Sequence, residues 1–177
     1  MSQAEIAGGR VTLAHELPAK GRRMRDFELR SANGRSIRIS DYRGRSNLVL
    51  IFADGRKQTT ELLSQLATAY EQVKGEGAEI LAIGRGSREQ CATTKEGLRL
   101  PFPVLADEDG RIHGEVGALD EQGRATAAVY ITDKFGEVFG VYRTLESQVL
   151  PSVADLLNWL EFVNSQCPEC EPPEWPA

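Results

Sequence analysis

Thiol groups are the side chains in this sequence whose type and spacing could do chemistry. The chain of 177 residues has three cysteines, Cys91, Cys167 and Cys170. Cys167 and Cys170 form a Cys-Pro-x-Cys string, and a two-residue spacer readily allows two thiols to close a disulfide. Three interpretations of this pair stay open: a redox or regulatory dithiol, half of a zinc site of four thiolates shared across a dimer, and a structural tail in which Trp175 docks on the domain.

The surroundings of these cysteines argue against a fast thioredoxin-type nucleophile. Cys167 and Cys170 follow a predicted helix, whose C-terminal end disfavours a thiolate, and the glutamates at 169, 171 and 174 disfavour it further. Cys91 lies within an earlier predicted helix, at a position expected to face a sheet, where a free cysteine behaves as a small hydrophobic residue.

The elements that must position these groups alternate between β-type runs and helix-period segments, which is typical of a layered α/β domain. Asn33-Gly34 lies between short strands at 26–29 and 36–39 and predicts a hairpin. The apolar run 47–52 predicts a central strand buried on both faces. Further strands are expected at 78–83, 102–105, 127–131 and 138–142, and helices at 59–74, 87–97, 111–116 and 152–164.

The ends of two helices carry capping signals. Thr59 or Thr60 is expected to cap the helix at 59–74, and Ser152 with Asp155 forms an approximate capping box for the last helix. Around this single domain, assigned to residues 21–165, we expect a loose N-terminal leader (1–20) and a Pro-rich tail with the Cys-Pro-x-Cys string (166–177).

The order of elements and several strings resemble the peroxiredoxin-like redoxins, the alkyl hydroperoxide reductase and thiol-specific antioxidant group. The resemblance covers about residues 20–165 and implies a thioredoxin-like fold with a central mixed sheet flanked by helices. The matching strings are Asp26-Phe27-Glu28-Leu29, Asn33-Gly34, Ser40-Asp41-Tyr42-Arg43-Gly44, Leu100-Pro101-Phe102-Pro103-Val104-Leu105-Ala106-Asp107 and the hairpin from Ile131 to Val138.

The resemblance also implies a peroxide-reactive cysteine at the start of the helix after the central strand, where the helix dipole stabilises a thiolate. Gln58 holds that position here, and no cysteine lies between Met1 and Gln90. An amide cannot form a sulfenic acid, so we expect standard peroxidase activity to be absent. What remains is a helix N-terminus suited to anions, and we predict a weak anion site formed by Arg56, Gln58 and Thr59 with Arg124, which resembles the family's second active-site arginine.

Composition excludes several other classes. Hydrophobic residues make up 41% and charged residues 27%, as in ordinary globular proteins, and no apolar run is long enough for a signal peptide or a membrane span. The stretch Lys20–Lys57 is basic, but its arginines have no interleaved aromatic residues, so we interpret it as a solvated face and expect no nucleic-acid partner. The strand-helix turn at 83–87 lacks a full dinucleotide fingerprint, and we expect no cofactor and no metal ligand set within one chain.

The sequence therefore predicts a cytoplasmic, peroxiredoxin-like thiol redox protein without the usual peroxidatic cysteine, whose redox chemistry rests on Cys167 and Cys170. Its expected partners are a thiol reductant protein and a second copy of the chain in a homodimer. The alternative is a non-enzymatic thioredoxin-fold binding or dimerisation module with a structural or zinc-binding tail.

Overall fold

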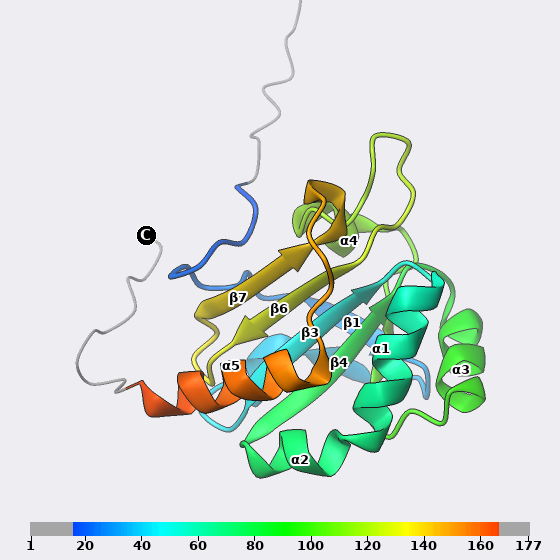
Figure 1. The fold of residues 1–177 in the computed structure, drawn as a ribbon. Coiled ribbons are helices and arrows are strands. Elements are labelled where there is room, and N and C mark those ends of the chain that lie inside the picture. Colours follow the sequence, from blue (N-terminus) through cyan, green and yellow to red (C-terminus); the bar gives the residue numbers. More distant parts are fainter. Residues whose placement is uncertain (1–15, 167–177) are drawn as a thin grey trace, which may run out of the picture.

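The computed structural model describes residues 16–166 as a seven-stranded mixed sheet covered on both faces (Figure 1). The strand order is β2-β1-β5-β4-β3-β6-β7; β3, β4 and β5 run parallel, and the other neighbouring pairs are antiparallel. The strands are β1 (Glu28–Ser31), β2 (Ser36–Arg38), β3 (Asn47–Ala53), β4 (Ala78–Gly84), β5 (Val104–Ala106), β6 (Ala128–Thr132) and β7 (Val138–Arg143). The helices are α1 (Lys57–Thr68), α2 (Tyr70–Gly75), α3 (Arg88–Gly97), α4 (Arg111–Glu115) and α5 (Val153–Ser165), with two 3-10 turns, η1 (Ile39–Tyr42) and η2 (Thr144–Glu146).

The predicted central strand is confirmed as β3, which lies between β4 and β6. Its side chains alternate between two cores, because successive residues of a strand point to opposite faces. Val49 and Ile51 pack with α1, α2, α3 and α5, whereas Leu50 and Phe52 pack with the N-terminal segment, η1 and α4. A continuous apolar run is therefore required here, since water reaches neither face.

Both predicted hairpins form. β1 and β2 pair around a turn in which Gly34 takes a φ of 86°, a backbone conformation that favours glycine. β6 and β7 pair around Asp133, whose carboxylate accepts the N–H groups of Phe135 and Glu137. The first strand begins two residues later than expected, at Glu28 instead of Asp26.

The helix expected at 59–74 differs from the structure in two ways. It begins earlier, at Lys57, so Thr59 and Thr60 lie inside the first turns and neither is the N-cap. It is also divided at Ala69 into α1 and α2. Tyr70 follows this break; its ring packs on Phe102 and its hydroxyl donates to Glu79 at 2.8 Å. These tertiary contacts bend the chain towards β4.

The expected capping box of the last helix is confirmed in α5. Ser152 Oγ accepts the N–H of Asp155 at 3.1 Å, and the Asp155 carboxylate accepts the N–H of Ser152 at 2.8 Å. α5 ends at Ser165, on the opposite side of the molecule from the start of α1 (Figure 1). Most of the predicted leader and tail lies outside the described residues, so the predicted domain boundaries stay predictions. None of the helices within residues 16–166 has the length and apolar character needed to cross a membrane.

Candidate functional site

The first turn of α1 is where the sequence predicted an anion site. β3 ends at Ala53, and Asp54 and Gly55 lead into the helix, with Gly55 at a φ of 73°. Asp54 Oδ1 accepts the backbone N–H of Arg56 at 3.0 Å and the hydroxyl of Thr59 at 2.6 Å. The free N–H groups of a helix start favour a negative charge, so this carboxylate stabilises α1. The hydrogen bonds of Asp54 go to the N-cap residue Arg56 and to the Thr59 hydroxyl, so its carboxylate acts on the helix dipole without capping the first-turn N–H groups.

The four residues of the predicted anion site do not come together at one place in the structure. Arg56 and Thr59 meet at Asp54, and Arg56 Nε lies 3.7 Å from Asp54 Oδ2. Gln58 is exposed in the first turn of α1. Arg124 belongs to the loop before β6 and pairs with Asp120, with Nε 2.7 Å from Oδ2. The structure brings two of the four residues together and joins a third to a separate carboxylate.

A larger cavity of about 510 Å³ opens beside this turn, between α1 and α3. It lies at the carboxyl ends of the parallel strands β3 and β4, the edge where open α/β sheets bind ligands. Thr59 contributes to its wall, but Arg56, Gln58 and Arg124 do not. The residues that line it are Ala53, Asp54, Gly55, Thr59, Thr60, Leu63, Ala82, Gly84, Arg85, Gly86, Gln90, Cys91, Thr94, Gly97, Leu98, Val104 and Ala125.

Cys91 forms part of the wall of this cavity, and its predicted burial is confirmed. The residue is 4% exposed, and its Sγ lies 3.5 Å from the carbonyl oxygen of Leu105. Burial raises the pKa of the Cys91 thiol, and a backbone hydrogen bond at Gly84 only partly offsets this effect. Cys91 is therefore a protonated, packed thiol at neutral pH and is a poor nucleophile.

Neither the cavity nor the place of Arg85 in its wall was predicted from the sequence. The available signal was the turn at Gly84-Arg85-Gly86, which joins β4 to α3 and was interpreted as a plain connection. A Cβ added at Gly84 would lie 3.0 Å from Cys91 Sγ, so glycine is what lets α3 approach the strand. Sequence alone could not show this distance, because it joins residues on two different elements.

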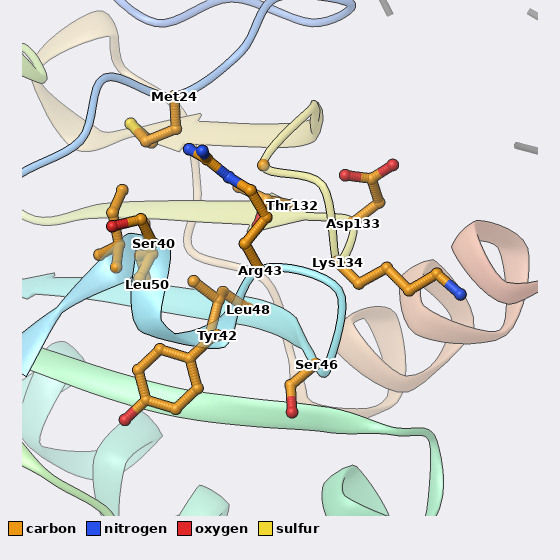
Figure 2. A pocket seen from close by; sticks show the side chains of 12 residues that line it. Met24, Ser40, Tyr42, Arg43, Ser46, Leu48, Leu50, Thr132, Asp133 and Lys134 are labelled. Carbon is orange, nitrogen blue, oxygen red and sulfur yellow. The ribbon is translucent and has the colours of Figure 1, made fainter. Parts of the chain in front are cut away.

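A second cavity lies at the other end of β3 and has room for about one water molecule, at about 20 Å³ (Figure 2). It is enclosed between η1 with its following turn and the β6–β7 hairpin, which contribute Tyr42, Arg43 and Thr132. The Thr132 hydroxyl is buried and has no hydrogen-bond partner within residues 16–166. This volume excludes an organic ligand.

A buried His–Asp pair was also missed. His113 and Asp107 are both 0% exposed, with Nδ1 of the histidine 2.7 Å from Oδ2 of the aspartate. Burial raises the pKa of Asp107, but hydrogen bonds from the side chain and backbone of His113 outweigh it and lower the pKa overall. No cavity described here reaches this pair, and we assign it a structural role that holds α4 against β5.

The predicted catalytic pair, Cys167 and Cys170, lies outside the described residues. The last described helix, α5, ends at Ser165, on the opposite side of the molecule from the start of α1 (Figure 1). Within residues 16–166, no group of three or more His, Cys, Asp or Glu side chains could hold a metal ion.

The arrangement of strands and helices is shared with solved peroxiredoxin structures. A cysteine-to-serine mutant of PrxQ from Xylella fastidiosa matches with a TM-score of 0.74 at 16% identity, over 85% of this chain and 99% of that chain. Peroxidoxin BcpB from Mycobacterium tuberculosis matches with a TM-score of 0.71 at 19% identity, over 84% of this chain and 97% of that chain. At such identities the likeness concerns the fold, which is thioredoxin-like.

Sequence comparison defines the family. The model of the AhpC/TSA family matches residues 20–140, so the chain belongs to this family of peroxiredoxin-like redoxins. Putative chloroplastic peroxiredoxin Q of Oryza sativa subsp. indica is 30% identical over 130 residues, which cover 70% of this chain and 58% of the rice protein. A peroxiredoxin of Ignicoccus hospitalis is 23% identical over 173 residues, 92% of this chain and 74% of that protein. The chain thus spans less than two thirds of the rice relative.

Proposed function

We propose that this protein is a thiol redox protein of the peroxiredoxin-like group that works without a cysteine at the start of α1. The observation that carries the proposal is the chemistry of that turn, where Gln58 is exposed and the Asp54 carboxylate, just before α1, accepts the hydrogen bond of the Thr59 hydroxyl. A carboxylate at this position would repel a neighbouring thiolate and stabilises the helix in its place. Cys91 is buried and protonated, which leaves Cys167 and Cys170 as the candidate redox groups.

The proposed reaction is the oxidation of the Cys167 and Cys170 thiols to a disulfide. The two thiols release two protons and two electrons, which reduce a hydroperoxide to an alcohol and water. A thiol reductant protein then donates two electrons and two protons to restore the dithiol. We expect this turnover to be slow, because acidic neighbours disfavour the thiolate that must attack. We further propose a cytoplasmic location, where such a reductant is available, and a homodimer.

Membership in the AhpC/TSA family favours this redox function over the non-enzymatic binding module. The predicted anion site is retained as a proposal with one change. Because Asp54 already binds Thr59 and pairs with Arg56, an external anion at the first turn of α1 competes with this carboxylate and binds weakly. Arg124 contributes only if it leaves Asp120.

Intact mass measured before and after oxidation by hydrogen peroxide tests the redox proposal. We expect a reversible loss of two hydrogens, assigned by thiol labelling to Cys167 and Cys170. Replacing either residue by serine should abolish this loss, whereas Cys91→Ala serves as the matched control and should retain it. Peroxide consumption that persists unchanged in the Cys167→Ser/Cys170→Ser double variant would show that the dithiol is not the redox group.

A further inference from the structure

The cavity between α1 and α3 has the size and the wall chemistry of a small-molecule site. Its volume of about 510 Å³ falls within the range of about 300–1,000 Å³ that is usual for such sites. Apolar side chains from three elements and from the turn after α3 form much of its wall: Leu63 of α1, Ala82 of β4, Val104 of β5 and Leu98. A ligand that fills this space must have an apolar body.

Two charged side chains line the cavity, and they differ in their partners. The Asp54 carboxylate accepts a hydrogen bond from the Thr59 hydroxyl and pairs with Arg56, so its charge is compensated within the protein. Arg85 has no hydrogen bond or ion pair with any residue in the described range 16–166. Cys91, on the same wall, is uncharged because burial raises the pKa of its thiol. The uncompensated charge of the cavity is therefore positive.

Gly110, at the start of α4, is a close neighbour of the Arg85 side chain. The guanidinium lies against Gly110 at the start of α4, where a Cβ would come within 2.7 Å of Arg85 Nε. Gly110 has a φ of 73°, so the backbone itself favours the residue that leaves this space open. Arg85 is exposed and lines the cavity at the end of β4, so its charge-assisted hydrogen bonds are left for a ligand.

We propose that this cavity binds a small amphipathic carboxylate, with its apolar body between α1 and α3 and its carboxylate on Arg85. A guanidinium binds a carboxylate through two parallel hydrogen bonds, and the apolar wall accepts an alkyl or aryl group. This binding needs neither Cys167 nor Cys170 and is independent of the proposed redox function.

Octanoate and its uncharged counterpart octanol are suitable probes, and isothermal titration calorimetry on the full chain measures the binding of each. We expect octanoate to bind at one site per chain and at least fivefold more tightly than octanol. The absence of octanoate binding at tens of millimolar would refute the proposal.

Two substitutions separate the charge from the apolar wall. Arg85→Gln should weaken octanoate binding about tenfold and should leave octanol binding unchanged. The tenfold effect is the lower end of the range for a hydrogen bond to a charged group, because Arg85 is exposed. Arg88→Gln is the matched control, since Arg88 lies on α3 but does not line the cavity, and it should change neither affinity. Thr94→Phe, at an exposed wall position of α3, should weaken both probes. Equal octanoate affinity in the wild type and in Arg85→Gln would overturn the assignment of the carboxylate to Arg85.

Discussion

Replacing Asp54 by alanine will measure how far the start of α1 depends on one carboxylate. Arg56 is the N-cap residue of α1, and the hydrogen bond from its backbone N–H to Asp54 Oδ1 contributes about 1 kcal/mol. Thr59, which is 1% exposed, then keeps a buried hydroxyl without its acceptor, at a further cost of about 1–3 kcal/mol. The ion pair with Arg56 contributes little, because Arg56 is 71% exposed. We expect the free energy of unfolding to fall by about 3 kcal/mol, the sum of these terms.

The Asp54→Asn variant is the control for charge. Its amide oxygen can still accept the hydrogen bonds of Arg56 and Thr59, so only the interaction with the helix dipole is lost, about 0.3–1 kcal/mol. For a chain of this size each kcal/mol shifts Tm by about 2–4 °C, so Asp54→Ala should lower Tm by about 6–12 °C and Asp54→Asn by about 1–4 °C. Calorimetry and urea unfolding measure both. Equal losses in the two variants would refute the role given to the Thr59 hydroxyl.

The same variants test the proposed anion site. Removing the Asp54 carboxylate takes away the negative charge beside the first turn of α1 and frees Arg56 to bind an external anion. Phosphate should then raise the Tm of Asp54→Ala more than that of the wild type; at ten times its Kd the gain is about 1.4 kcal/mol. A Tm that phosphate leaves unchanged in both proteins would rule out an anion site at this turn.

Two further predictions concern stability. The folded protein lowers the pKa of Asp107, so this residue stabilises the fold above its unfolded-state pKa of about 3.9, and the stabilisation is lost as the pH falls below that value. Asp107→Asn should therefore lose less stability than the wild type between pH 5 and pH 3, as measured by urea unfolding. An unchanged dependence of the free energy of unfolding on pH would contradict this account. Ser152→Ala removes one half of the capping box with Asp155 and should lower the free energy of unfolding by about 1 kcal/mol, seen as a Tm about 2–4 °C lower. A Tm equal to that of the wild type would mean that the Asp155 carboxylate alone caps α5.

The fold could largely be predicted because its elements carry local signals. The apolar run of β3, the Asn33-Gly34 turn and the Ser152 cap each depend on residues close in sequence, and each forms as expected. The break at Ala69 could not be predicted in this way. It depends on contacts of Tyr70 with Phe102 and Glu79, which the sequence separates but the sheet brings together.

What is known of the candidate site also divides into features that the sequence alone shows and features that depend on tertiary contacts. By itself, the sequence determined that no thiol lies before Cys91, because residue type alone decides whether a sulfenic acid can form. The assignment of Gln58 to the position of the family's reactive cysteine stays a prediction. Only the tertiary structure decided that Asp54 binds the Thr59 hydroxyl, that Arg124 bonds to Asp120, and that Arg85 and Cys91 line one cavity. These relations depend on distances and burial between separate elements, which exist only once the sheet and its helices have packed.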